Sequence, residues 1–114
     1  MAELDDLVAV AHREYAEARP RSAAAHRRAR EVLPGGNTRS VLHFEPFPFR
    51  VAGGEGCELV DIDGYRYVDF CGNYTAGLLG HSPPAVRAAI TEALEGGWAL
   101  GATHERETDL AELL

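Results

Sequence analysis

The chain has 114 residues, 46% of them apolar and 25% charged, with a formal net charge of -7. This composition indicates a folded globular chain of about one domain, and no apolar run is long enough to span a membrane. The acidic balance argues against nucleic acid or an anionic membrane surface as the main partner. The acidic amino terminus lacks the basic start of a signal peptide, so we expect a cytoplasmic protein.

The two ends of the chain are predicted to be helical. Apolar residues recur at helical spacing from about residue 4 to residue 18, and Pro20 ends that stretch. A second amphipathic helix is predicted from Ser22, as N-cap, to residue 33. One face of it carries an arginine cluster that we expect to be solvated: Arg27, Arg28 and Arg30.

The middle of the chain is predicted to form three short strands, at residues 47–52, 57–62 and 65–70. A two-residue turn at Asp63-Gly64 would join the last two strands. That turn would place Leu59 opposite Val68 and Asp61 opposite Arg66.

The cysteines, Cys57 and Cys71, fall on this predicted hairpin. With a two-residue turn, Cys57 lies opposite Phe70, so the two thiols point to opposite faces of the sheet. We therefore expect two reduced thiols.

Two more helices are predicted after the sheet. One has Ser82 as N-cap and Pro83 as its first residue, and it stops at Gly96-Gly97. The other begins near Thr103 and carries apolar residues up to Leu114 without a stop signal, which suggests a fragment. The fold class predicted is α+β, with amino-terminal helices, a short antiparallel three-stranded sheet, and then helices.

Most motifs that could hold a ligand are better explained as turns. The Asp61-Ile-Asp-Gly64 run lacks the remaining ligands of a calcium loop, and the glycines at 53–56 lead into a strand instead of a helix. The five histidines share no metal-ligand spacing, so we expect no metal. Arg39 lies in a loop of turn-forming residues, where its guanidinium suits either a carboxylate ligand or a surface salt bridge.

All 11 basic residues are arginine, so the chain has no lysine. A Schiff base between a side-chain amine and an aldehyde cofactor therefore cannot form within these residues. Codon usage in the source explains the absence equally well.

Three motifs resemble the amino-terminal part of class III aminotransferases, which use pyridoxal phosphate. They are Pro-Gly-Gly-Asn-Thr-Arg-Ser-Val at 34–41, the run from Gly54 to Phe70, and Gly-His-Ser-Pro-Pro-Ala-Val-Arg-Ala-Ala-Ile at 80–90. The resemblance covers roughly residues 31–114. It is greatest to glutamate-1-semialdehyde aminomutases and to transaminases of β-amino acids such as β-phenylalanine.

The resemblance implies the small domain of a fold type I enzyme. Residues 1–33 would be its amino-terminal helices, and residues 34–114 the first part of the small domain, before the large cofactor-binding domain. The parent would be a homodimer acting on amino acid and keto acid substrates. By analogy, Arg39 would bind the substrate carboxylate, Val41 and Tyr74 would line the pocket, and Asn73 would lie beside it.

The family's Schiff-base lysine and phosphate loop would lie beyond Leu114, so this chain alone should be catalytically silent. The resemblance implies pyridoxal 5'-phosphate as the cofactor of the parent enzyme, which would be a transaminase or, alternatively, a glutamate-1-semialdehyde aminomutase. A hypothesis of another class is a truncated product that acts only as an interaction module.

Overall fold

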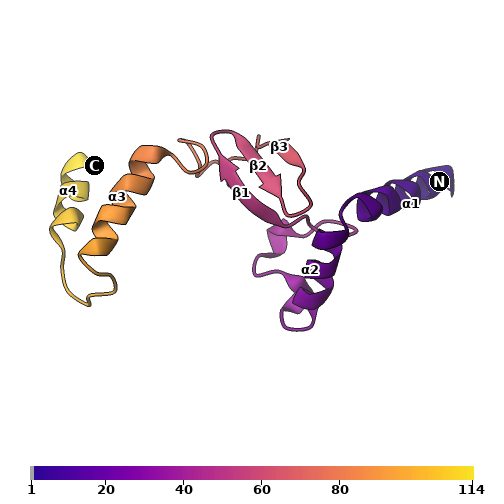
Figure 1. The fold of residues 1–114 in the computed structure, drawn as a ribbon, viewed down its shortest axis with the longest axis horizontal. Helices are drawn as coiled ribbons and strands as arrows, with labels where there is room; N and C mark the ends of the chain where they lie inside the picture. Colours follow the sequence, from indigo (N-terminus) through magenta and orange to yellow (C-terminus); the bar gives the residue numbers. More distant parts are fainter. Residues whose placement is uncertain (1) are drawn as a thin grey trace. The chain divides into compact units, whose positions relative to one another are not determined.

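The computed structural model describes residues 2–114, which form two compact units: the first extends to Ser82, and the second is Pro83–Leu114. The sequence predicted a division after residue 33, into helices and small domain. That division stays a prediction. The elements in chain order are α1 (Ala2–Ala18), α2 (Pro20–Arg30), the 3-10 turns η1 (Pro34–Gly36) and η2 (Ser40–Leu42), β1 (Val51–Glu55), β2 (Glu58–Asp61), β3 (Arg66–Val68), α3 (Pro84–Glu95) and α4 (Glu105–Leu113) (Figure 1).

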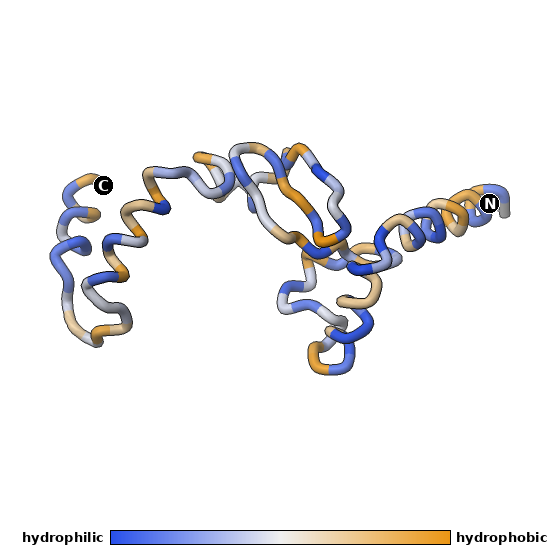
Figure 2. Tube along the Cα trace, in the orientation of Figure 1, coloured by the Kyte–Doolittle hydropathy of each residue, from blue (hydrophilic) through white to orange (hydrophobic). Residues whose placement is uncertain are grey.

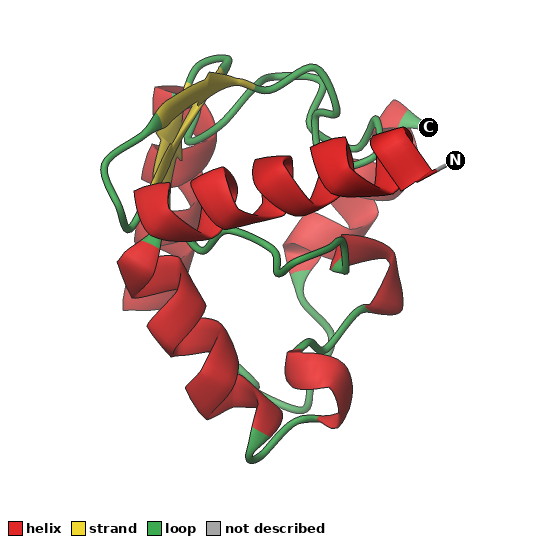
Figure 3. Ribbon diagram, turned by 90° about the vertical axis from the view of Figure 1, so that its right-hand side faces the viewer, coloured by secondary structure: helices red, strands yellow, loops and turns green. Residues whose placement is uncertain are grey.

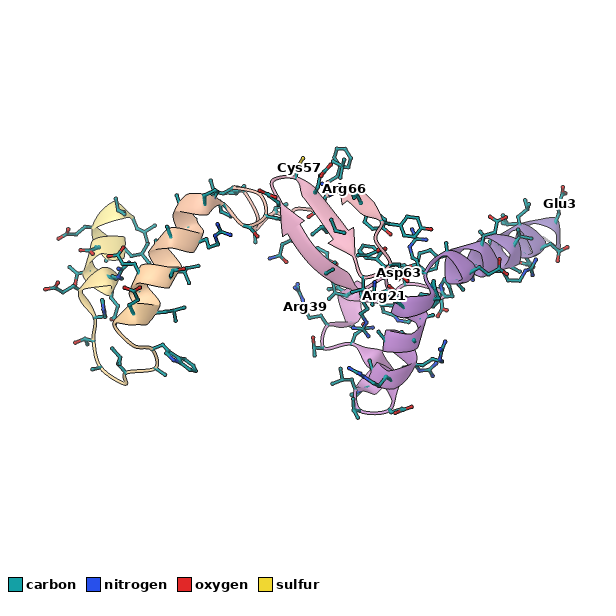
Figure 4. The ribbon with its side chains drawn as sticks, in the orientation of Figure 1. Glu3, Arg21, Arg39, Cys57, Asp63 and Arg66 are labelled. Carbon is teal, nitrogen blue, oxygen red and sulfur yellow. The ribbon has the colours of Figure 1, made fainter. Side chains whose placement is uncertain are left out.

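The two amino-terminal helices are separated by Arg19, which leaves the helical conformation directly before Pro20. The prediction of Ser22 as the N-cap of α2 is wrong, because α2 begins at Pro20. Its first-turn N–H groups are instead capped from the hairpin: Asp63 accepts hydrogen bonds from the backbone nitrogens of Arg21 (2.8 Å) and Ser22 (2.9 Å). Figure 4 shows Arg21 and Asp63 beside one another.

The sheet is antiparallel with strand order β1-β2-β3, as predicted; its strands lie side by side in Figure 1 and are drawn in yellow in Figure 3. Two predicted details are wrong. The first strand begins four residues later than predicted, at Val51, and takes in Gly53 and Gly54, which were expected to form a turn. The peptide groups of these glycines pair with Val60 and Leu59 of β2, which a turn could not do.

The hairpin register also differs by one residue from the prediction. Leu59 pairs with Tyr67, and Glu58 with Val68. The cause lies in the turn, where Asp61 still pairs with Tyr65 and its Oδ1 accepts hydrogen bonds from the backbone nitrogens of Asp63 (3.0 Å) and Tyr65 (2.8 Å). The loop therefore has three residues, and its last, Gly64, has the positive φ of 97° that favours glycine.

The new register places Arg66 opposite Val60. Arg66 forms its ion pair with Glu58, two residues before Val60 on β2, rather than with Asp61. Cys57 accepts a backbone hydrogen bond from Asp69 instead of facing Phe70. Both cysteines are free and exposed.

The core of the first unit is aromatic and centred on Phe47, which is 7% exposed. Its ring lies 5.1 Å from that of Tyr15 in α1 and 6.1 Å from that of His26 in α2. A second stack joins Phe49 to Tyr67 of β3 at 4.7 Å. These contacts attach both helices to the segment that leads into the sheet.

A polar network lies beside this core, around the fully buried side chain of Asp61. Its Oδ2 accepts a hydrogen bond from the Tyr67 hydroxyl (2.6 Å) and lies 3.7 Å from the Arg19 Nε. The Arg19 guanidinium also lies 4.4 Å from the centre of the Tyr15 ring and 4.5 Å from that of Tyr65. One arginine between the helices thus holds α1 against the hairpin.

The second unit consists of α3 and α4. The first begins at Pro84, one residue later than predicted, because Ser82 has a φ of 53° and Pro83 is the N-cap. It ends at Glu95, with Gly96 as the C-cap, which agrees with the predicted stop at Gly96-Gly97. The helix α4 begins at Glu105, where His104 and Glu107 form a capping box.

Hydrophobic and hydrophilic residues alternate along α1 and α3 (Figure 2). Several apolar side chains of α3 and α4 are exposed in the described residues, among them Ile90 (56%) and Leu113 (83%). None of the described helices is long and apolar enough to cross a lipid bilayer.

Candidate functional site

A pocket of about 830 Å³ lies in the first unit, a volume typical of small-molecule sites. It is built from the loop containing η2, the segment leading into β1, the loop after β3, and Leu59 of β2. The residues that line it are Asn37, Arg39, Val41, Leu42, Phe44, Pro48, Phe49, Arg50, Val51, Leu59, Asp69, Cys71, Asn73, Tyr74 and His81.

The residues singled out by the resemblance all line this pocket: Arg39, Val41, Asn73 and Tyr74. They come from loops more than thirty residues apart in sequence. Their roles toward a substrate stay a prediction, but the pocket brings their side chains to one place.

Arg39 and Tyr74 are in contact across the pocket. The Arg39 guanidinium carbon lies 5.5 Å from the centre of the Tyr74 ring, within cation–π range. The Tyr74 hydroxyl donates a 3.2 Å hydrogen bond to the backbone oxygen of Val41. Arg39 is exposed, forms no salt bridge with the other described residues, and stands clear of the ribbon in Figure 4. Its donors are thus available to a ligand.

Tyr74 is held in an unusual backbone conformation. Four successive residues have left-handed φ angles: Gly72 (53°), Asn73 (52°), Tyr74 (56°) and Thr75 (72°). Left-handed residues other than glycine cost about 1–2 kcal/mol each, and Thr75 is β-branched. The turn is closed by hydrogen bonds from Thr75 N to the Cys71 oxygen (3.1 Å) and from Gly77 N to the Gly72 oxygen (2.8 Å).

Asp69 and His81 lie at the base of this turn. Asp69 Oδ1 accepts hydrogen bonds from the backbone nitrogens of Cys71 (2.8 Å) and Gly72 (3.1 Å), and its Oδ2 lies 2.8 Å from His81 Nε2. The Gly72 and Cys71 N–H groups, with a smaller contribution from His81, hold the pKa of Asp69 below its usual value. The carboxylate is therefore ionised at neutral pH.

The sequence reasoning missed Asp69, His81 and the aromatic pair Phe44 and Phe49 as pocket residues. A signal existed for Asp69, since an aspartate three residues before a glycine in a loop is a typical acceptor for local backbone N–H groups. The aromatic residues had no local signal, because they reach the pocket only through the path of the chain into β1.

The pocket does not fit a covalent pyridoxal phosphate site made by this chain alone. The sequence contains no lysine, and the pocket's cations are Arg39 and Arg50. Arg50 Nη2 already donates to the Gly36 oxygen (3.0 Å), and Arg50 Nε is buried without a hydrogen-bond partner among the described residues. The pocket offers a free guanidinium and apolar walls, a combination suited to an organic carboxylate. In the described residues, no three His, Cys, Asp or Glu side chains are grouped to hold a metal.

Comparisons with known proteins agree with this description. The sequence model of the family "Aminotransferase class-III" matches residues 42–114. The chain is 43% identical over 113 residues to the β-phenylalanine transaminase of Variovorax paradoxus. This match covers 99% of the chain and 26% of that protein. The chain is also 43% identical over 94 residues to the glutamate-1-semialdehyde 2,1-aminomutase of Methanothermobacter thermautotrophicus. This match covers 82% of the chain and 22% of that protein.

Solved structures give the same result. The crystal structure of the Variovorax paradoxus β-phenylalanine aminotransferase superposes with a TM-score of 0.90 at 44% identity, over 96% of this chain and 25% of that one. A transaminase with pyridoxal phosphate bound superposes with a TM-score of 0.80 at 37% identity, over 82% of this chain and 22% of that one. The chain thus spans about a quarter of the length of the relatives it matches, with the α+β arrangement of a fold type I enzyme. It belongs to the class III aminotransferases.

Proposed function

We propose that the chain is the amino-terminal segment of a longer, dimeric, pyridoxal-phosphate-dependent aminotransferase, and that its pocket binds the carboxylate and side chain of an amino acid substrate. The observation that supports this most directly is the convergence of Arg39, Val41, Asn73 and Tyr74 on one pocket. The exposed apolar residues of α3 and α4 fit the same proposal, because the rest of a longer protein would cover them.

The chemistry of amino transfer belongs to the cofactor, which would be held by residues outside this chain. The residues of this chain would bind and orient the substrate. Arg39 would hold the substrate carboxylate through two parallel N–H···O hydrogen bonds, while the Tyr74 ring keeps the guanidinium in place. Fixing the carboxylate in this way sets the position of the reacting amino group.

The walls of the pocket favour an apolar or aromatic substrate side chain. Val41, Phe44, Phe49 and Val51 line it together. Aromatic side chains prefer such surroundings, where edge-to-face contacts add to burial. We therefore propose a β- or α-amino acid with an aromatic side chain as amino donor and a keto acid as acceptor. The name of the Variovorax paradoxus relative, a β-phenylalanine transaminase, supports the same choice.

The test is Arg39→Ala in the complete enzyme. Losing a bidentate carboxylate contact costs about 2–4 kcal/mol, which corresponds to roughly 30- to 1000-fold in kcat/KM. Arg39→Lys should recover only part of this, because an ammonium lacks the planar fork. Arg66→Ala is the matched control, since Arg66 is a surface arginine paired with Glu58 and does not line the pocket.

The second readout is an amine without a carboxylate, such as 1-phenylethylamine, for which Arg39→Ala should cost much less. Equal losses for both substrates, or turnover unchanged by Arg39→Ala, would exclude the proposed role.

A glutamate-1-semialdehyde aminomutase is the second candidate, favoured by the 43% identity to the Methanothermobacter thermautotrophicus enzyme. Both reactions use a carboxylate-bearing substrate, so Arg39 serves either. Incubation of the complete enzyme with glutamate-1-semialdehyde and no keto acid separates them, because only the aminomutase yields 5-aminolevulinate from a single substrate.

A further inference from the structure

The left-handed turn that carries Tyr74 is fixed at its base by Asp69. That carboxylate uses one oxygen for the two backbone N–H groups of Cys71 and Gly72 and the other for His81. Its side chain is only 9% exposed. Removing it would leave the N–H groups of Cys71 and Gly72, where the chain enters the strained 72–75 turn, without partners.

His81 connects this carboxylate to the sheet. Its backbone forms a two-way bridge with Gly56, with Gly56 N to His81 O at 3.0 Å and His81 N to Gly56 O at 2.7 Å. The neighbouring Gly80 has a φ of 74°, and a Cβ there would lie 2.5 Å from the Gly56 oxygen. The approach of the two segments thus requires glycine at 80 and holds His81 firmly against the end of β1.

At the other end of the turn, Tyr74 contacts the residues that would bind the substrate carboxylate. Its ring lies under the Arg39 guanidinium and its hydroxyl bonds to the Val41 oxygen. A continuous set of contacts therefore runs from Gly56 through His81, Asp69 and the turn to Tyr74, and then to Arg39.

We propose that Asp69 and His81 are positioning residues for the substrate site: they hold the strained 72–75 turn so that Tyr74 supports Arg39. This inference rests on the proposed function, because it assigns to the pair the placement of the carboxylate-binding arginine. The two residues act through Tyr74, without a direct role toward the substrate.

The experiment measures kcat and KM of the complete enzyme for an aromatic β-amino acid and for 1-phenylethylamine. Asp69→Ala should raise KM for the amino acid at least tenfold, with a change of less than threefold for the amine. The chain offers a matched control in Asp63→Ala. Asp63 also accepts two backbone N–H bonds and one side-chain bond, from Ser22, but does not line the pocket. Asp63→Ala should lower the melting temperature and leave the KM values for both substrates within twofold of wild type.

A second comparison separates positioning from direct contact and from general destabilisation. In a Tyr74→Ala background, Asp69→Ala should change KM for the amino acid by less than threefold, because the residue through which it acts is already missing. If Asp69→Ala does not yield folded enzyme, His81→Gln takes its place in the same comparison, with the same expected suppression by Tyr74→Ala.

The proposal is overturned if Asp69→Ala and Asp63→Ala raise KM equally, if KM for the amino acid stays within twofold of wild type, or if the Asp69 effect persists in full in the Tyr74→Ala background. Failure of the proposed function gives a different result. In that case Arg39→Ala itself would not discriminate between the amino acid and the amine, whatever Asp69→Ala does.

Discussion

Asp61 offers the sharpest test of how the first unit is held together. Its side chain is fully buried and accepts hydrogen bonds from Asp63 N, Tyr65 N and the Tyr67 hydroxyl, beside the Arg19 guanidinium. Asp61→Ala would leave these three donors without an acceptor and the cation without its counter-charge. An unsatisfied buried polar group costs about 1–3 kcal/mol, and breaking a buried ion pair about 3–5 kcal/mol.

Some of these groups are half-buried and would regain water, so the expected loss is about 3–5 kcal/mol and not the full sum. This is a large part of the roughly 5–15 kcal/mol that stabilises a domain. Asp61→Asn keeps an oxygen for the two backbone N–H groups and loses only the charge and the acceptor for Tyr67. Its expected cost is about 1–3 kcal/mol.

Hydrogen exchange of the peptide covering residues 58–68 in the complete enzyme is the assay, because it reports the opening of this hairpin directly. Asp61→Ala should speed its exchange at least 100-fold, since each ~1.4 kcal/mol is a factor of ten. Glu58→Ala is the control, as it removes an exposed ion pair with Arg66 worth about 0–1 kcal/mol. If Asp61→Ala and Glu58→Ala exchange at the same rate, the buried network does not stabilise the hairpin as argued.

Two further predictions concern pH and the cofactor. Burial, followed by the charges of Arg50 and Arg30, lowers the pKa of His26, so the unfolded chain takes up this proton first as the pH falls. Stability should therefore decrease as the pH falls below about 6.5, until folded His26 is protonated as well. The urea midpoint of His26→Gln should fall less between pH 7.5 and 5.5 than that of the wild type, and parallel curves would contradict this. The isolated 114-residue chain, mixed with pyridoxal phosphate and borohydride, should carry an adduct only at its α-amino group, because it has no lysine. A mass-spectrometric adduct on an internal residue would refute that prediction.

The sequence by itself determined the features that depend on near neighbours along the chain. The end of α1 before Pro20 follows from the backbone limits of proline, and the end of α3 at the Gly96-Gly97 pair follows from the freedom of glycine, because Gly97 has a φ of 97°. Both ends were predicted. The absence of lysine and the three family motifs are equally properties of the linear chain. The helix and strand patterns sufficed to predict the α+β class, and the three motifs sufficed to predict the family, which the comparisons confirm.

The tertiary structure alone decided what depends on contacts between distant residues. Asp63 replaces Ser22 as the cap of α2 across 41 or more positions. This cannot be read from a local pattern, because a side chain that caps its own segment and one that caps a distant segment look alike in sequence. The shift of the hairpin register has a local cause instead, because Asp61 Oδ1 accepts hydrogen bonds from the backbone nitrogens of Asp63 and Tyr65. The pocket, like the cap of α2, depends on contacts between distant residues. Arg39 and Tyr74 meet only because the chain folds back between them, and Asp69 and His81 fix the turn that makes them meet.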